Sequence, residues 1–595
     1  MRRFWLLFVA GTLFAGVGCS SSSDTKKKAN KDSSTENRES SLAAYLDKPI
    51  DANSCKELLQ NYIASLPEAK ALKLKKAVAG LKESLTSIPA LSLKPDAEFL
   101  ISEEFVLADA IYLEENLLLR EVEKNLQLSK LAPELRAKKA FEWVCRQVYI
   151  KNRPLQASMA APAHITLQSG CGMPWDRSYT FLALLRHLDL EGFLLAPPEL
   201  NKTMFLSGNA PNPASKSGPA PSSAPKVAPI WGVGVLIGKD MLIFDSQTGT
   251  QVMLAGGQPA KIQDLKKDGE LVSRIIEPKR PFTLTSDQVR QSVPFIAAPL
   301  SSLAARMKFL DEDLKHELSL HRDVVAAMTK LKDAGFEPQI WNVPGDPANF
   351  CHLIQLLAIN PPILDQIRSQ VIPMEAFPRV FFTLESEQAR GGPLKIFSNG
   401  FLKMHFNMDG NPEADPPIVQ GLFRGSLNDT INKLLKLKDT AEAERQIIQK
   451  DPNLEKEVFK WCEAANQAYA ALSRAERSND ASAKALAQGN IEQIFKASGR
   501  AMSLVSRVVF TMTSKDALYY VAMAVHEKAE RLSLRALAEP GKISAALIKD
   551  AWKDSVDWWS RYLNYSVGGN ELGNAAREAH ANKLKEQATQ LAESK

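Results

Sequence analysis

The most constraining feature of this chain is one pair of strand-like segments, "VGVLI" and "MLIFD", in a sequence whose other periodic segments are mostly helical. Gly238-Lys239-Asp240 between them predicts a β-hairpin, and "GFLLAPP" upstream predicts a further strand. The segments 134–150 and 171–188 carry helical patterns just before these strands. Residues 133–280 are therefore expected to form an α+β core, in which helices pack against an antiparallel sheet.

Large, mostly α-helical regions flank this core. Residues 46–132 carry apolar side chains at every third or fourth position, residues 281–426 combine helices with a small β element near 379–410, and residues 427–595 are helical again. In the last region Trp552, Val556, Trp559 and Leu563 form one stripe, which is typical of a core between packed helices. "YYVAMAVHEKAERLSLRA" resembles helical hairpins of the tetratricopeptide kind, which implies a concave face for a protein partner.

The N-terminal segment has the features of an export signal. Arg2 and Arg3 precede an apolar run from Phe4 to Gly18, and "AGVGC" ends this run at Cys19. The run is shorter than the roughly 20 residues that a membrane span needs, which favours cleavage. The segment resembles a bacterial lipoprotein signal, with a plain secretory signal as the alternative. This resemblance implies removal of residues 1–18, lipidation of Cys19 and a lipid anchor in the bacterial cell envelope.

Two stretches have the composition of exposed chain. Residues 19–45 begin with "CSSSSDTKKKANKDSSTENRESS", which offers almost no apolar surface to bury and predicts a disordered tether. Residues 207–229 are rich in Pro, Ser and Ala and predict an exposed insertion within the core. Neither stretch carries a motif for chemistry.

Composition narrows the classes of function. The formal charge is +6 at pH 7, and loss of Arg2 and Arg3 with the signal lowers it further, so nucleic acid is not an expected partner. The histidines are scattered, and the sequence has no CxxC or HExxH motif, so neither a metal nor a cofactor is expected. Five cysteines beyond Cys19 do not form a disulfide framework, and they are Cys55, Cys145, Cys171, Cys351 and Cys462.

Cys171 opens the segment "CGMPWDRSYTFLALLRHL", which predicts an amphipathic helix. Its apolar stripe follows the helical spacing i, i+3, i+4, i+7. The stripe consists of Phe181, Leu184, Leu185 and Leu188. Pro174 suits the first helical turn. A helix N-terminus and a neighbouring imidazolium both stabilise a thiolate, so Cys171 is the candidate nucleophile.

The order of these elements resembles the transglutaminase-like, or papain-like cysteine, core over residues 134–258. "AFEWVCRQV" lies on the first helix, a second helix ends in "LLR", and the strand pair follows. The resemblance implies a catalytic cysteine that opens the second helix. It also implies a histidine that begins the following strand and an aspartate near the end of the strand after that. In such a triad the aspartate orients the histidine, which activates the cysteine.

The cysteine position of this family is substituted here. Anchored on "LLR" at residues 184–186, it falls near Pro174 and Trp175, and neither side chain is a nucleophile. Cys171 lies three residues upstream of Pro174, a separation of up to roughly 10 Å in extended chain. The short context "SGCG" is the one feature that favours a return of Cys171 toward the helix.

The position of the triad histidine is not occupied by a histidine in this sequence. It falls in "VAPIW", just before the first strand of the hairpin, and no histidine occurs between His187 and His316. Asp245, in "LIFDSQTG", matches the aspartate of the triad but is also a common turn residue. His164 and His187 are the nearest substitutes for the missing base. The triad is therefore predicted to be incomplete.

The missing histidine favours a membrane-tethered envelope protein whose transglutaminase-like domain is inactive and which binds or scaffolds proteins or peptides. Trp175, Asp176 and Arg177 would then line the former cleft, or Trp175 would fill it. The alternative is a cysteine-dependent acyl transferase or peptidase with Cys171 as its nucleophile. In a third interpretation the helices of residues 430–595 carry the function and the core is a spacer.

Overall fold

The computed structural model describes most of the chain from residue 52 onward. The described ranges are 52–85, 99–150, 161–198, 230–278, 280, 284–341, 418–447, 480–496, 499–565 and 575–594, with single positions 467, 471, 474 and 475. Several predictions lie outside them: the signal 1–18, lipidation of Cys19, the tether 19–45, the insertion 207–229 and the β element near 379–410.

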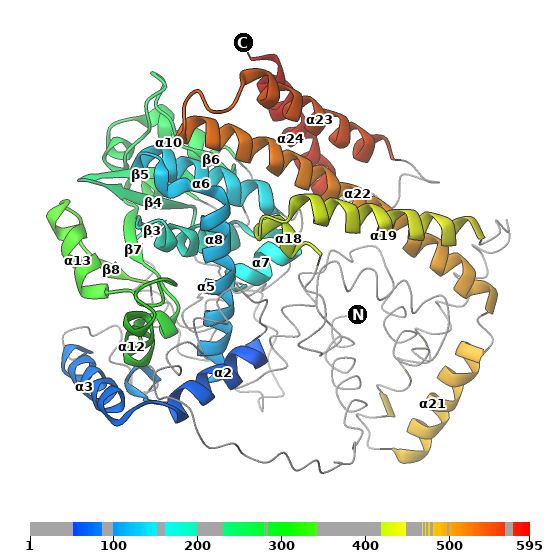
Figure 1. Ribbon diagram of the computed structural model, residues 1–595, viewed down its shortest axis with the longest axis horizontal. Coiled ribbons are helices and arrows are strands. Elements are labelled where there is room, and N and C mark those ends of the chain that lie inside the picture. The colour runs from blue at the N-terminus through cyan, green and yellow to red at the C-terminus, as the bar shows by residue number, and fades with distance from the viewer. Residues whose placement is uncertain are drawn as a thin grey trace, which may run out of the picture.

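The largest sheet among the described residues has six strands in the order β6-β5-β4-β3-β7-β8 (Figure 1). These strands are β3 (Glu191–Ala196), β4 (Gly232–Ile237), β5 (Asp240–Asp245), β6 (Thr250–Gln251), β7 (Val293–Ile296) and β8 (Gln339–Ile340). Neighbours are antiparallel except for β7 and β8. The predicted hairpin is confirmed: β4 and β5 pair across a two-residue turn that begins at Gly238, where φ is 62° and glycine is favoured.

Strands β7 and β8 correct the expectation that the only β element of residues 281–426 lies near 379–410. β7 pairs with β3 in the middle of the sheet, and β8 extends the sheet beyond it. Short helices do occur in this stretch, namely α11 (Ser286–Arg290), α12 (Ala305–Asp313) and α13 (Val324–Asp333). Strands of four and two residues are too short to show an alternating pattern, so periodicity alone could not reveal them.

Both faces of the sheet are buried. Along β3, Leu194 and Ala196 belong to one hydrophobic core, whereas Phe193 and Leu195 belong to another, because successive side chains of a strand point to opposite faces. The first core contains α6 (Pro133–Gln147) and α8 (Pro174–His187). The second core contains residues of α2 (Ala52–Ala64), α3 (Glu68–Leu85), α10 (Gly269–Ile276) and α12.

Helix α8 lies where an amphipathic helix was predicted and packs against the hairpin, but residues 174–185 are buried on every side, so the expected solvent-facing side is absent over this stretch. The predicted stripe is fully buried, and the Phe181 ring lies 4.9 Å from that of Phe141 on α6 and 5.3 Å from that of Phe244 on β5. Pro174 occupies the first turn, where its missing N–H costs no hydrogen bond. Asp176 then accepts a hydrogen bond from the Met173 backbone N–H, which fixes the start of the helix.

Helix α5 (Leu107–Leu126) runs beside α8 and connects the two cores. Ile111 and Leu118 pack in the first core, whereas Leu113 and Leu117 pack in the second. Between α6 and α8 the chain forms β1 (Tyr149–Ile150), α7 (Ala163–Ser169) and β2 (Cys171–Gly172), and β1 pairs in parallel with β2. This pairing places residue 171 beside the end of α6.

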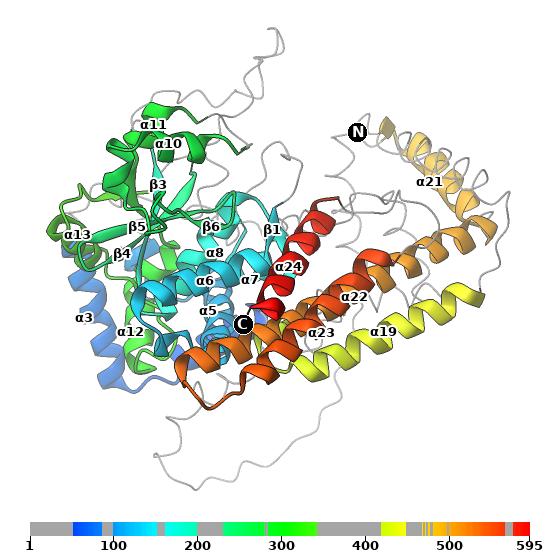
Figure 2. The same ribbon diagram turned by 90° about the horizontal axis from the view of Figure 1, so that it is seen from above.

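Several C-terminal helices contribute residues to the first core (Figures 1 and 2), namely α18 (Gln420–Phe423), α19 (Leu427–Ile447), α22 (Gly499–Ala538), α23 (Ala545–Asn564) and α24 (Ala575–Glu593). A further helix, α21 (Ala481–Lys496), lies away from the sheet in both views, and none of its described residues belongs to that core. Trp559 of the predicted aromatic stripe is buried against Tyr519 and Tyr562. Within the described ranges, no helix combines the length and the apolar character that a bilayer crossing requires.

Candidate functional site

Cys171 lies in β2 rather than on the helix, three residues before α8 begins. Its backbone pairs with Tyr149, and its side chain is only 1% exposed. Tyr149, Tyr519 and Tyr520 surround it: burial raises the pKa of each phenol, and the neighbouring thiol raises it further. The sulfur therefore sits among protonated tyrosines, away from solvent.

The three residues expected to line a cleft are all buried, and two of them, Asp176 and Arg177, bind backbone groups. Trp175 is 2% exposed and belongs to the first core. The Asp176 carboxylate accepts backbone N–H groups from Met173 at 2.8 Å and from Ala161 at 3.0 Å. Asp176 therefore caps the helix and ties the preceding loop to it.

Arg177 on α8 binds backbone carbonyl groups of two other segments, the end of α6 and the turn after β5. Its guanidinium donates to the carbonyl of Val148 at 2.7 Å, to that of Ser246 at 3.2 Å and to that of Cys145 at 3.4 Å. Cys145 is a second buried thiol at this end of α6. Burial raises the pKa of Cys145, and the positive charge of Arg177 offsets this only in part, so this thiol is protonated at neutral pH.

Asp245 ends β5, where the family resemblance places the aspartate of the triad, but its partner is an arginine. The Arg280 guanidinium donates to both carboxylate oxygens, at 2.7 and 3.1 Å. Both side chains are almost fully buried. Asp245 also accepts the Gln247 backbone N–H at 2.9 Å, which closes the turn after the strand. This carboxylate neutralises a buried cation and shapes a turn.

The expected histidine position holds a buried tryptophan. Trp231 stands directly before β4 and donates its indole N–H to the Ser292 hydroxyl at 2.9 Å. The substitute histidines are used elsewhere. His187 hydrogen-bonds the Asn116 side chain at 3.0 Å, and burial lowers its pKa to about 3. His164 lies between two carboxylates, described below.

The end of α6 is covered by α24, from the far end of the chain (Figure 2). His580 donates from Nε2 to the Arg146 carbonyl at 2.9 Å, and Lys583 donates to the Thr248 carbonyl at 3.2 Å. Arg577 lies 5.7 Å from the centre of the Tyr149 ring. Sequence reasoning missed His580, because nothing local to residues 575–593 indicates contact with the end of α6, which lies more than 400 positions away in the chain.

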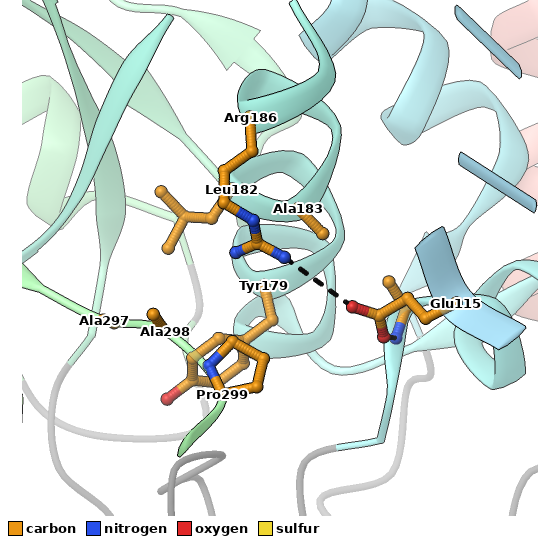
Figure 3. Close-up of a pocket in the computed structure, with 9 residues that line it drawn as sticks. Glu115, Tyr179, Leu182, Ala183, Arg186, Ala297, Ala298 and Pro299 are labelled. Atoms are coloured by element: carbon orange, nitrogen blue, oxygen red, sulfur yellow. Dashed lines mark hydrogen bonds and ion pairs between the residues drawn. The ribbon is translucent and has the colours of Figure 1, made fainter. Parts of the chain in front are cut away.

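A small pocket lies elsewhere, between α5, α7, α8 and the segment after β7 (Figure 3). Four of its residues share one face of α8, at the spacing of helical turns. The lining residues are Glu115, Ala163, Tyr179, Leu182, Ala183, Arg186, Ala297, Ala298 and Pro299. The Arg186 guanidinium faces the Glu115 carboxylate across 3.8 Å. We call this set the Arg186 pocket.

Two carboxylates flank His164 next to the Arg186 pocket. Its Nε2 lies 3.6 Å from the Glu114 carboxylate, and its Nδ1 lies 3.9 Å from that of Glu115.

In the part of the chain that the structure describes, no three His, Cys, Asp or Glu side chains are grouped so that they could hold a metal ion. Comparison of the chain with family models, with curated proteins and with solved structures found no match.

Proposed function

We propose that this chain is a lipid-anchored envelope protein whose core is a degenerate transglutaminase-like domain without catalytic activity, and that it binds or scaffolds proteins or peptides. The order of elements supports the family assignment: α6, then α8 packed against an antiparallel hairpin, with an aspartate at the end of its second strand. The fold alone does not decide the activity, which depends on the side chains.

One observation supports the loss of catalysis most strongly: every position of the triad has a structural role. Pro174 and Trp175 start a buried helix, Trp231 bonds to Ser292, and Asp245 pairs with Arg280. A nucleophile and its base must lie within about 3 Å of each other, or be linked by one water. His164 and His187 instead face Glu114, Glu115 and Asn116.

The covering helix supports the same proposal. α24 packs on β1, the strand that pairs with the Cys171 strand, so the chain's own C-terminal region closes this end of the core. An acyl transferase or a peptidase needs an open path for its substrate to the sulfur. A binding protein needs only exposed surface, and the C-terminal helices provide a large amount of it.

Thiol labelling tests the loss of catalysis. The full chain is treated with iodoacetamide at pH 7, and peptide mass spectrometry follows each cysteine over time. Because both thiols are buried, Cys171 and Cys145 should react at similarly slow rates, and both should react quickly in denaturant. The Cys171→Ser variant should lack the labelled peptide that contains Cys171, which identifies the signal of this cysteine. Rapid labelling of Cys171 alone in the native protein would instead support a cysteine enzyme.

The anchor is tested separately through Cys19. In a bacterial host, the natural chain should separate with the membranes and carry added lipid mass at its N-terminus. Cys19→Ser should move the chain to the soluble fraction of the envelope. A Cys19→Ser variant that stays with the membranes would contradict lipid anchoring. This result would not bear on the proposal that the core is inactive.

A further inference from the structure

Helix α3 presents one exposed side at the outer edge of the molecule (Figures 1 and 2). Because each residue turns the helix by about 100°, positions 72, 75, 76, 79 and 82 fall within about a third of its circumference, and all of them are exposed. The opposite side of α3 contains the buried Leu74 and packs on α12. We call the exposed set the lysine face, and it consists of Leu72, Lys75, Lys76, Ala79 and Lys82.

The lysines of α3 divide into two groups by their partners. Lys70 lies 2.7 Å from the Asp313 carboxylate on α12. Lys73 lies 3.2 Å from the carboxylate of Glu312 on the same helix. The three lysines of the lysine face, in contrast, form no ion pair with any residue that the structure describes. The sequence of α3 contains five lysines and two glutamates, so the helix is basic as a whole.

Leu72 gives the lysine face an apolar side chain. It is 54% exposed and lies about one helical turn before Lys75 and Lys76. A single exposed leucine is common on soluble proteins, but a leucine among lysines is the pattern of a helix that lies on a lipid surface. There the leucine enters the boundary of the acyl chains, while the long lysine side chains extend their ammonium groups to the phosphates.

We propose that the lysine face of α3 contacts the anionic phospholipid surface of the membrane to which the chain is anchored. This contact rests on the lipid anchor of the proposed function, which holds the chain near a bilayer. The first elements that the structure describes after Cys19 are α2 and α3, and residues 20–51 span at most roughly 110 Å even when fully extended. The phosphates of the bilayer supply the acidic partners that the three lysines lack. Helices α19 and α22, which lie away from α3 in both views, would then face the aqueous phase (Figures 1 and 2).

The expected strength of this contact makes it dependent on the anchor. Attraction to an anionic bilayer strengthens binding by about fivefold for each lysine near the surface. Three lysines supply about a hundredfold, and this attraction weakens as salt screens it. Such binding is too weak to hold a protein by itself at physiological ionic strength, but it orients a chain that a lipid already holds at the surface.

Vesicle sedimentation tests the contact in the absence of the anchor. The parent chain for this test is residues 19–595 with Cys19→Ser, which has neither the signal nor the lipid. At about 20 mM salt it should sediment with vesicles that contain about one-third phosphatidylglycerol. It should stay in solution with vesicles of phosphatidylcholine alone, and about 0.5 M salt should release it from the anionic vesicles.

Two matched triple variants locate the contact. Lys75→Gln combined with Lys76→Gln and Lys82→Gln should weaken binding to the anionic vesicles by about a hundredfold. The control removes the same charge on the β4–β5 turn and just before α10, and it should stay within about threefold of the parent chain. Its changes are Lys239→Gln, Lys266→Gln and Lys267→Gln. All six side chains are exposed, so circular dichroism of both variants should remain native.

Leu72→Gln should weaken binding by about fivefold, because a leucine gains free energy when it leaves water. Equal losses in the two triple variants would overturn the proposal, since they would show that net charge alone attracts the chain. Tighter binding to polyglutamate than to anionic vesicles would also overturn it, in favour of an acidic protein partner.

The fractionation test of Cys19 separates this contact from the anchor. If the parent chain fails to bind anionic vesicles while Cys19→Ser still releases the protein from the membranes of the host, the contact is refuted and the anchor stands. Vesicle binding by a chain whose Cys19→Ser variant stays with those membranes would support the contact and contradict the anchor.

Discussion

Asp245 and Arg280 form a buried ion pair, which fixes the role of a carboxylate that the sequence offers for catalysis. The guanidinium donates to both oxygens and also to the Ile275 carbonyl at 2.7 Å, so it joins β5 to the end of α10. A buried ion pair adds little net stability compared with apolar residues, but removal of one partner leaves the other charge uncompensated. Loss of the Asp245 carboxylate is therefore expected to destabilise the fold mainly because it leaves the buried Arg280 charge without its partner.

This predicts the effect of Asp245→Asn. The substitution keeps the shape of the side chain but removes its charge, and the free energy of unfolding measured by urea denaturation should fall by about 3–5 kcal/mol. Asp240→Asn, at the other end of the same strand, is the control, because its pair with Lys261 is solvent-exposed and worth little. A fall of the same size for both variants would contradict a special role for the Arg280 pair.

At the scale of elements, the β4–β5 hairpin leaves no room for a side chain at Gly232. A Cβ atom there would lie 2.6 Å from the carbonyl oxygen of Phe244 on the partner strand. That oxygen belongs to the backbone, so it cannot move without separating the two strands. The same strand pair carries Asp245 opposite Gly232, so a shift would also disturb the ion pair.

Gly232→Ala should therefore lower the free energy of unfolding by about 3 kcal/mol, at the upper end of what overpacking costs. Gly256→Ala is the matched control, because nothing lies within 4 Å of the added methyl group there. Its effect should stay within about 0.5 kcal/mol in the same urea titration. If Gly232→Ala matched the control, the close approach of the two strands would be refuted.

The sequence predicted the elements that are defined by neighbours in the chain. Helices α6 and α8 and strands β3, β4 and β5 follow local periodicity and turn residues, and each lies where it was expected. The strands β7 and β8 were not predicted, because only their pairing with distant partners makes them strands. The pairing of Asp245 with Arg280 and the contact of His580 with Arg146 were not predicted for the same reason, since no local pattern encodes a long-range contact.

At the scale of the whole molecule, helices α18, α19, α22, α23 and α24 contribute to the same hydrophobic interior as the core. Trp143 on α6 donates its indole N–H to Glu527 on α22 at 3.1 Å, and Arg146 lies within 3.7 Å of both Glu527 and Glu530. Residues of α22 such as Tyr519 are buried in the same core as Phe141. The two parts are thus expected to unfold together.

The contact of α24 with the core should make stability depend on pH. Burial, together with the charge of Arg177, lowers the pKa of His580 to about 3, whereas an unfolded histidine titrates near 6.5. Between these values the unfolded chain binds a proton that the folded chain does not, so stability is full above pH 6.5 and falls as the pH drops toward 3.

His580→Gln should reduce this loss. Between pH 7 and pH 5 the natural chain should lose about 1–2 kcal/mol more than the variant, as measured by urea denaturation at each pH. Asn582→Ala, at an exposed position of the same helix, should keep the full pH dependence. An unchanged slope for His580→Gln would show that this imidazole does not stay neutral in the folded protein.

The outer strands of the six-stranded sheet, β6 and β8, are only two residues long. A strand of that length presents almost no unpaired backbone N–H and C=O groups, and long exposed rows of such groups are what allow sheets of different molecules to fuse. These short edges therefore protect the sheet against edge-to-edge aggregation. Among the described residues, this sheet is equally unsuited to capturing an extended peptide as an additional strand.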